Sequence, residues 1–229
     1  IWKVRRDGRK FTNLTQDGKT KNIRYGRDYR LYPEDEGIDL DKDLYLRIYG
    51  EYTKKNGIGK ISRGKPGVEK LFFSDHNYRD LKKAEDADIF VYTKEDFDSF
   101  HDYYATDEKF TNSKKITNVN PQQADYLWSS GRRIIDYVTE YGDSLQGVLY
   151  LPANYEKGKT YPTIVYMYEK LSQRANNYLK PRLAGILNFS YYTSNGYAIF
   201  TPDITFKLND PGVSSVKCIT AGLEAAMAT

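Results

Sequence analysis

Cysteine, histidine and methionine are scarce in this chain of 229 residues, which contains one Cys, two His and two Met. A single cysteine, Cys218, excludes a disulfide within the chain and a metal site built from several cysteines. His76 and His101 lie far from that cysteine and outside the short spacings at which paired histidines bind zinc. We therefore expect no metal site and no cofactor, and we interpret both histidines as residues of loops or strand ends.

Long hydrophobic runs and concentrated positive charge are also absent. No run approaches the ~18 consecutive apolar residues that a membrane-spanning helix needs. The net charge is only +4, with 35 basic residues interspersed among 31 acidic ones, whereas proteins that bind a phosphate backbone concentrate their basic residues. Neither a membrane span nor a nucleic-acid partner is therefore expected.

The two ends of the sequence predict a fragment. Residues 1–6 resemble no signal peptide and have the pattern of the middle of a strand, and residues 221–229 have the pattern of an interrupted helix.

Aromatic residues are abundant instead, at 15% of the chain with 22 Tyr. This bias is typical of β-sheets, in which tyrosine packs its ring and exposes its hydroxyl. Over residues 1–120, short alternating segments are separated by polar turns, a pattern that favours a sandwich, a barrel or a propeller. The strands predicted there are 2–5, 10–14, 44–49, 59–62, 68–73, 88–92 and 102–106, with Asp7-Gly8 as the turn of the first hairpin.

A weak internal repeat favours the propeller among these folds. The segment Asp7–Thr15 is similar to Asp107–Thr117, about a hundred residues further along. This separation corresponds to roughly two propeller blades of ~40 to 50 residues each. Both segments carry an acidic turn, an aromatic residue and a later threonine. A diverged sandwich would produce the same pattern.

From about residue 121 the pattern changes to strands that alternate with helices. Residues 133–141 and 144–151 predict a hairpin that turns at Gly142-Asp143. Two later segments are apolar on both faces, as strands inside a sheet are, and each is followed by a helical pattern that predicts an α/β sheet. We expect these strands to be parallel neighbours. The predicted strands are 163–168 and 197–203, and the predicted helices are 183–193, ending at Asn195-Gly196, and 213–228.

Two serines lie in near matches to G-x-S-x-G, the motif of an exposed serine nucleophile. That motif requires a strand, a sharp turn and then a helix. In Gly142-Asp143-Ser144-Leu145-Gln146-Gly147 the serine begins a strand, so the context is a hairpin. Ser214 follows a polar loop at the start of a helix, where hydroxyls cap free N–H groups. The chain is therefore predicted to contain no nucleophile elbow.

The later part of the chain resembles the prolyl oligopeptidase family of serine peptidases, especially its dipeptidyl-peptidase and acylaminoacyl-peptidase-like branches. That family carries a pattern of the type D-G-x-x-L-x-G-x-L-x-x-P followed by K-x-Y-P. Here GDSLQGVLYLP (142–152), with the Asp-Gly order changed, and KTYP (159–162) are similar to it, as are YYTSNGYAIFTPDI (191–204) and DPG (210–212). The resemblance covers 118–229, and over 1–117 it rests on IWKVRRDG and the blade-like repeat.

The resemblance implies a partial β-propeller over 1–120 and the N-terminal half of an α/β-hydrolase domain over 121–229, interrupted before the nucleophile elbow. It implies a serine peptidase that cleaves oligopeptides through an acyl-enzyme, periplasmic or secreted, with the catalytic Ser, Asp and His beyond this chain. The chain alone is then expected to be inactive, and its exposed sheet edge to favour self-association. Two alternatives are a non-catalytic binding protein on a degenerate scaffold and an esterase.

One functional position of the family falls inside the chain. Family members place a tyrosine at the end of the first parallel strand, where its hydroxyl helps to bind the oxyanion of the tetrahedral intermediate. By position this residue is Tyr168. The family continues with Gly-Gly-Pro-like residues, whereas Glu169-Lys170-Leu171-Ser172 follow here, and Pro202–Phe206 likewise lacks the family's Arg and Gly. The structural alternative is a tyrosine that only packs at a strand end.

Overall fold

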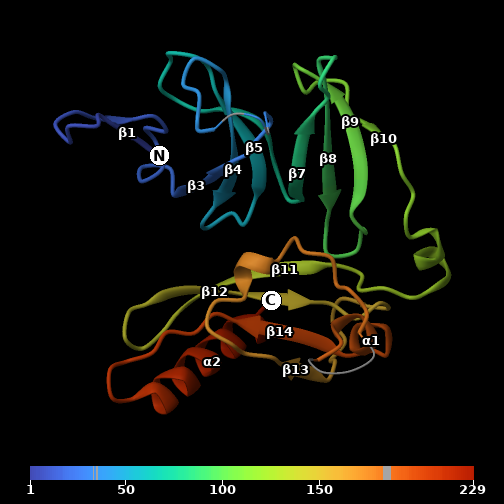
Figure 1. The fold of residues 1–229 in the computed structure, drawn as a ribbon. Helices are drawn as coiled ribbons and strands as arrows, with labels where there is room; N and C mark the ends of the chain where they lie inside the picture. The colour runs from blue at the N-terminus through green and yellow to red at the C-terminus, as the bar shows by residue number, and fades with distance from the viewer. Residues whose placement is uncertain (33, 35, 183–186) are drawn as a thin grey trace. The chain divides into compact units, whose positions relative to one another are not determined.

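The computed structural model describes residues 1–229 except 33, 35 and 183–186. The chain divides into two compact units, Ile1–Val119 and Asn120–Thr229. The described residues form mostly antiparallel β-sheets with few helices (Figure 1). Each unit has its own sheets and its own core.

The first unit contains a hairpin and two four-stranded sheets in which every strand pairs with its neighbour in the chain. All of these pairings are antiparallel. A four-stranded antiparallel meander is the form of a propeller blade, so this unit is propeller-like. The hairpin consists of β1 (Trp2–Val4) and β2 (Phe11–Asn13). The first sheet consists of β3 (Ile23–Asp28), β4 (Leu44–Gly50), β5 (Asn56–Ile61) and β6 (Glu69–Ser74). The second sheet consists of β7 (Asn77–Lys83), β8 (Ile89–Glu95), β9 (Asp102–Asp107) and β10 (Lys114–Lys115).

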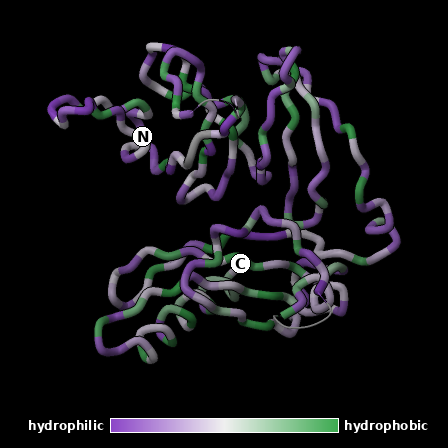
Figure 2. Tube along the Cα trace, in the orientation of Figure 1, coloured by the Kyte–Doolittle hydropathy of each residue, from purple (hydrophilic) through white to green (hydrophobic). Residues whose placement is uncertain are grey.

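Aromatic rings make up most of the core of the first unit. Phe72 stacks on Tyr78 with ring centroids 5.0 Å apart and lies equally close to Tyr92. Such pairs add stability beyond the area that they bury, which gives the abundant tyrosines of this unit a structural role. Along the strands of Figure 2, hydrophobic segments alternate with hydrophilic ones, as strands with one buried face require. The buried members of this core are Leu31, Tyr45, Ile58, Tyr78, Leu81, Phe90, Tyr92 and Phe110.

The strands predicted in the first unit are found, and the first hairpin turns at Gly8, whose φ of +72° suits glycine. Three strands, β3, β7 and the two-residue β10, were not predicted. Of these, β3 and β7 share one feature. Each contains a shift of register, between Tyr25 and Asp28 in β3 and between Arg79 and Lys82 in β7. A bulge of this kind changes which residues face the core, so the alternation that identifies a strand is broken inside both segments.

The second unit is built on one mixed sheet with the strand order β11-β12-β14-β13. The pairs β11–β12 and β12–β14 are antiparallel, whereas β13 and β14 run parallel, as the sequence predicted. The strands are β11 (Arg132–Val138), β12 (Ser144–Tyr150), β13 (Thr163–Val165) and β14 (Ala198–Pro202); the helices are the 3-10 helices η1 (Pro121–Asp125) and η2 (Ser172–Arg174), and the α-helices α1 (Phe189–Ser194) and α2 (Pro211–Met227).

The prediction that both parallel strands are buried on both faces is right for β14 and wrong for β13. Every residue of β14 is buried. In β13, Thr163 is exposed and the next two residues are half-buried, and the strand ends at Val165, three residues earlier than predicted. The reason is position: β13 lies at the edge of the sheet and has β14 as its one strand partner among the described residues.

The two α-helices cover opposite faces of this sheet. In α2, a Cβ on Gly222 would lie 3.2 Å from the rings of both Tyr137 and Phe200, so the helix packs closely on that face. Phe189 of α1 contacts the ring of Tyr150, and the strand pairings place Tyr150 on the opposite face from Phe200. No helix in the described part of the chain is long and apolar enough to span a membrane.

The helix predicted over 213–228 is confirmed as α2, and the helix predicted over 183–193 is shorter than expected. Residues 183–186 lie outside the described part of the chain. Helix α1 begins at Phe189 because the side chain of Asn188 accepts the free N–H of Tyr191 at 3.3 Å and caps it. It ends where the sequence predicted, before Gly196 with a φ of +85°.

Candidate functional site

The first near-miss serine, Ser144, lies in a hairpin, as predicted. It is the first residue of β12 and pairs with Val138 at the end of β11. The turn is closed by the N–H of Thr139, which donates to the carbonyl of Asp143 at 3.0 Å, and Gly142 has a φ of +80°. No helix follows this serine, so it is not a nucleophile elbow.

The second glycine of the same motif, Gly147, is explained by packing. A Cβ at this position would lie 2.6 Å from a ring carbon of Phe200 and 3.2 Å from the Cα of Pro202. Strand β14 therefore lies close against a backbone that carries no side chain. The motif therefore resembles a catalytic signature only because Gly142 forms the turn and Gly147 allows the close approach of β14.

The second near-miss serine, Ser214, lies in the first turn of α2, as predicted, but it does not cap the helix N–H groups. Its hydroxyl donates to the carbonyl of Asp210 at 2.5 Å and accepts the N–H of Lys207, which precedes the helix. The side chain is buried. Both histidines of the chain, His76 and His101, belong to the first unit, so Ser214 has no histidine in its own unit to activate it.

The features that favour a ligand in the second unit lie at the carboxyl ends of β13 and β14. The N–H of Tyr166 donates to the carbonyl of Phe200 at 2.9 Å and extends the parallel ladder by one step. Because the strands are parallel, the segments that follow them leave the sheet at the same end. In open α/β sheets, ligands bind at the carboxyl ends of the strands.

Asp203, directly after β14, holds the segment that follows β13. Its side chain is buried, with 4% of the residue exposed. One carboxylate oxygen accepts the backbone N–H groups of Leu171 and Ser172 at 2.8 and 2.9 Å, and the other accepts the hydroxyl of Ser172 at 2.5 Å. The N–H of Ile204 also donates to the carbonyl of Glu169 at 2.9 Å. These four bonds fix residues 169–172 against the end of β14.

The backbone of Asp203 is held from the other side of the sheet by Tyr137. The Tyr137 hydroxyl donates to the carbonyl oxygen of Asp203. Burial, and then the nearby Asp203 carboxylate, raise the pKa of Tyr137, so the phenol stays protonated and keeps donating at neutral pH. The strand end is therefore anchored before any ligand arrives.

Tyr168, the residue identified from the sequence, lies between β13 and the segment that Asp203 fixes. It is 66% exposed, and its hydroxyl forms no hydrogen bond with another described residue. It therefore does not pack as a buried strand-end tyrosine. A phenol directly before a fixed segment at this end of the sheet has the chemistry to donate a hydrogen bond to an oxyanion.

A cavity of about 240 Å³ opens on the α1 face of the same sheet. Its walls combine aromatic rings with cations, so it suits a ligand with apolar and anionic groups. Tyr168 does not line this cavity, although Tyr166 and Leu171 on either side of it do. The lining residues that set its chemistry are Tyr150, Tyr166, Tyr178, Phe189, Arg174 and Lys180.

Metal ligands do not gather in the described part of the chain: no group of three or more His, Cys, Asp or Glu there could hold a metal ion. The single cysteine, Cys218, is buried in α2, and its thiol lies 3.7 Å from the hydroxyl and the carbonyl oxygen of Thr205. Its position is that of a core residue.

Comparison with known proteins identifies the fold. No protein-family model and no curated protein matches the chain. Among solved structures, it is similar to an acylaminoacyl peptidase in complex with Z-Gly-Gly-Phe-chloromethyl ketone, with a TM-score of 0.66 and 14% identity over 96% of this chain. It is also similar to Porphyromonas gingivalis dipeptidyl peptidase 4, with a TM-score of 0.63 and 14% identity over 89% of this chain.

A third similar structure is the acylaminoacyl peptidase of Pyrococcus horikoshii, with a TM-score of 0.58 and 14% identity over 82% of this chain. The chain spans 33%, 27% and 29% of these three solved chains, in the order given. The structural neighbours are thus peptidases of the prolyl oligopeptidase family. At this identity, what the chain shares with them is the fold.

Proposed function

We propose that this chain is part of a serine peptidase that hydrolyses oligopeptides through an acyl-enzyme. The observation that carries the proposal is the sheet of the second unit. An antiparallel hairpin, β11–β12, leads into the parallel pair β13–β14, and 96% of the chain is similar in fold to a solved peptidase. In this proposal residues 1–120 are part of a β-propeller, and residues 121–229 are the first half of an α/β-hydrolase domain.

The catalytic serine, aspartate and histidine of the proposed peptidase lie in sequence beyond Thr229. Two observations support this. Neither Ser144 nor Ser214 lies in an elbow, and the chain spans a third or less of the solved peptidases that it resembles. The next strand of the sheet would add to the free edge of β13. The 229 residues alone are then inactive, and the complete enzyme is secreted or periplasmic.

In the proposed reaction Tyr168 stabilises the oxyanion. The serine oxygen adds to the peptide carbonyl carbon, and the carbonyl oxygen takes up the negative charge. A hydroxyl donor aimed at that charge lowers the barrier. The amine leaves with a proton, and water then hydrolyses the acyl-enzyme. Asp203 is a positioning residue here, because it fixes Leu171 and Ser172, in the segment that directly follows Tyr168, and does not itself touch the substrate.

The test is to read and express the sequence that follows Thr229. We expect a further strand and G-x-S-x-G within about 20 residues, as the elbow topology requires. A fluorophosphonate probe should label the extended protein and leave the 229-residue chain unlabelled. A stop codon directly after Thr229, or labelling of the 229-residue chain itself, would overturn the proposal.

The same extended protein separates the two alternatives. A non-catalytic binding protein would carry another residue at the elbow serine and would not react with the probe. An esterase would react, but would hydrolyse ester substrates and leave the corresponding peptides intact. The peptidase proposal therefore requires both labelling and cleavage of a peptide bond.

A further inference from the structure

The first unit contains a second cavity, of about 350 Å³, whose lining is strongly basic. This volume lies in the range of sites for small ligands, about 300–1,000 Å³. The cavity lies between the N-terminal hairpin and the β4–β5 side of the neighbouring sheet, and all of its walls belong to one compact unit. No acidic side chain is among the lining residues that the structure describes. Its six cations are Lys3, Arg5, Lys10, Lys42, Arg63 and Lys65.

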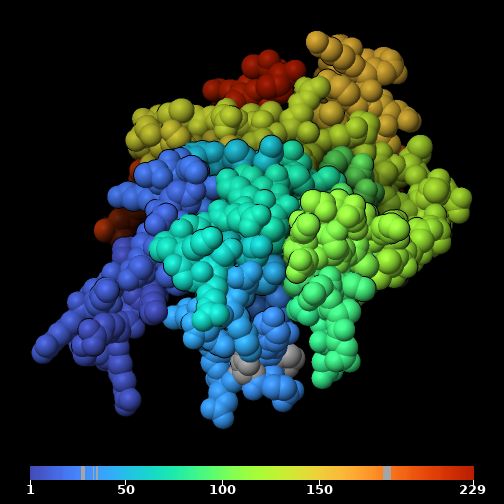
Figure 3. All heavy atoms as spheres, turned by 90° about the horizontal axis from the view of Figure 1, so that it is seen from above, coloured from blue at the N-terminus to red at the C-terminus, as the bar shows by residue number. Residues whose placement is uncertain are grey.

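The hairpin has two chemically different faces, because side chains alternate along a strand. Lys3 pairs with Thr12 on the face that lines the cavity. Trp2 and Phe11 lie on the other face and are 62% and 63% exposed. In Figure 3 the hairpin, in dark blue, projects from the rest of the first unit. The N–H of Gly67 donates to the carbonyl of Leu14 at 2.8 Å and ties the base of the hairpin to the loop after β5.

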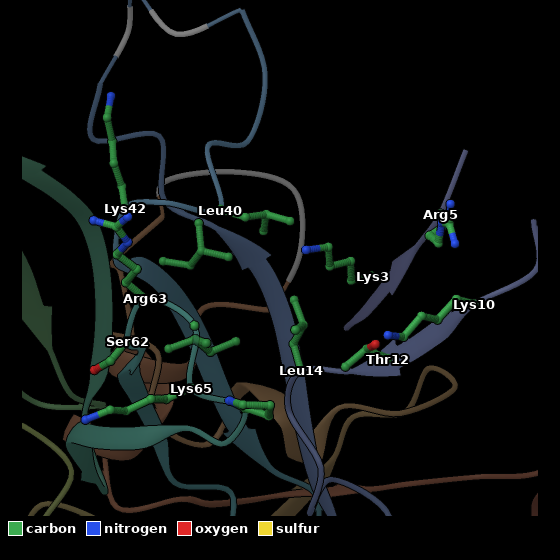
Figure 4. A pocket seen from close by; sticks show the side chains of 14 residues that line it. Lys3, Arg5, Lys10, Thr12, Leu14, Leu40, Lys42, Ser62, Arg63 and Lys65 are labelled. Carbon is green, nitrogen blue, oxygen red and sulfur yellow. The ribbon is translucent and has the colours of Figure 1, made fainter. Parts of the chain in front are cut away.

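The cations form two rims on either side of a hydrophobic floor. Figure 4 shows Lys3 and Lys10 on the hairpin side, Arg63 and Lys65 on the opposite side, and Leu14 and Leu40 between them. Lys3 extends from the hairpin toward Leu40. The floor is formed by Leu14, Leu40, Leu44 and Ile61.

Half of these cations form no salt bridge with a carboxylate of a described residue. Three are paired: Arg5 lies 3.6 Å from Asp7, Arg63 lies 3.7 Å from Asp41, and Lys42 lies 3.9 Å from Asp39. Lys3, Lys10 and Lys65 form no salt bridge with any described residue. Uncompensated like charges around one cavity repel one another. A ligand that brings negative charge between the rims would relieve this repulsion.

We propose that this cavity binds short acidic peptide segments, with ligand carboxylates on the two lysine-bearing rims and ligand apolar side chains on the floor between them. The apolar floor favours a peptide over an inorganic polyphosphate, which has nothing to place there. Lysine makes single-point contacts with carboxylates, and the rims lie on both sides of the floor. The best ligand therefore alternates acidic and apolar residues.

The experiment measures binding to the full chain by fluorescence anisotropy. The probe is a fluorescein-labelled peptide of alternating glutamate and leucine, and its matched control replaces every glutamate with glutamine. We expect only the acidic peptide to bind, and we expect its affinity to fall as salt is raised. The triple variant K3Q/K10Q/K65Q should weaken binding by about tenfold. The matched variant K19Q/K109Q/K157Q removes three exposed lysines outside the cavity and should leave the affinity unchanged.

A third variant tests the floor without changing the charge. Leu40→Asn should weaken the binding of the acidic peptide. Tripolyphosphate, used as a competitor of the labelled peptide, should keep its inhibition constant in this variant, because it has no group to place on the floor. Equal binding of the glutamine peptide, equal weakening by both triple variants, or no effect of Leu40→Asn would each overturn the proposal. The readout is binding and not hydrolysis, so these outcomes are independent of the proposed peptidase function.

Discussion

The carboxylate of Asp203 binds both the backbone N–H and the hydroxyl of Ser172, across 31 residues of sequence. This contact ties the segment that follows Tyr168 to the end of β14. A buried carboxylate that receives three hydrogen bonds leaves three donors unsatisfied when it is removed. Leu171 and Ser172 therefore depend on this one side chain.

Replacing Asp203 with alanine should destabilise the second unit by about 2–4 kcal/mol, because buried donors then lack an acceptor. Asp203→Asn keeps one carbonyl oxygen and should be milder. The measurement is chemical denaturation followed by the fluorescence of Trp128, in a Trp2→Phe background that removes the only other tryptophan. Ser172→Ala completes a double-mutant cycle and should show coupling with Asp203→Ala. Additive effects of the two changes would contradict the contact.

Replacing Gly147 with alanine should destabilise the same unit by about 1–3 kcal/mol, because the new methyl group would overlap the ring of Phe200. Gly131→Ala is the matched control. A Cβ there would meet only a side-chain carbon of Leu151 at 3.6 Å, an ordinary contact. The same fluorescence measurement compares the two variants. Equal stability of both would show that the close approach of β14 is wrong.

Asp102 should make the stability of the first unit depend on pH in the acidic range. Its carboxylate binds Lys115 at 2.6 Å, the hydroxyl of Thr117 at 2.7 Å and the N–H of Val119 at 2.9 Å. Burial by itself raises the pKa of Asp102, but these three partners outweigh burial and lower the pKa below its ordinary value of 3.8. The stabilisation is therefore present above pH 3.8 and is lost as the pH falls through the lowered pKa.

The corresponding variant is Asp102→Asn, with Asp86→Asn in an exposed turn as the control for lost charge. Near pH 7, Asp102→Asn should lower the free energy of unfolding by about 1–3 kcal/mol. The difference from the unmodified chain should shrink as the pH falls below 3.8. Denaturation followed by circular dichroism at several pH values gives this difference. A difference that stays constant down to pH 2 would contradict the assignment.

Much of this fold follows from local patterns, and the exceptions have identifiable physical causes. Alternation found the regular strands and the hairpin at Gly142, because one buried face imposes a period of two. It failed at β3 and β7, where bulges change the phase. It also placed β13 inside the sheet, because an apolar run does not reveal whether a strand has one neighbour or two.

The candidate sites depend on contacts between distant segments, which local patterns do not report. Tyr168 was proposed from the family resemblance, which gives a position after a strand. The role of Asp203 was not predicted, because its partner Ser172 lies 31 residues earlier. The basic cavity was missed for the same reason: Lys3 and Lys65 are far apart in sequence and line one cavity only after folding. A balanced net charge conceals such local clusters.

In the extended protein, Tyr168→Phe should lower kcat by about 10-fold to 1,000-fold and change KM little, since the hydroxyl acts on charge that develops only in the transition state. Tyr126→Phe, at a tyrosine that is also highly exposed, is the control and should have no effect. Steady-state kinetics on a peptide substrate give both constants. An unchanged kcat for Tyr168→Phe would remove this residue from the proposed mechanism.

The free edge of β13 should drive self-association of the chain. The N–H of Tyr166 donates to the carbonyl of Phe200 in β14, and the carbonyl of Pro162 accepts the N–H of Ala198 in the same strand. Because backbone groups alternate in direction along a parallel strand, the N–H of Val165 points away from β14. An exposed edge of this kind pairs with another strand. We therefore expect concentration-dependent association in sedimentation velocity measurements.

Val165→Pro removes the outward N–H without removing a bond to β14, and should shift the chain toward monomer. Val165→Ala removes two methyl groups of the side chain but keeps the N–H, so it should associate as the unmodified chain does. This comparison separates edge pairing from hydrophobic contact through the side chain. Equal association of the proline and alanine variants, or a monomeric unmodified chain at high concentration, would show that this edge is not the interface.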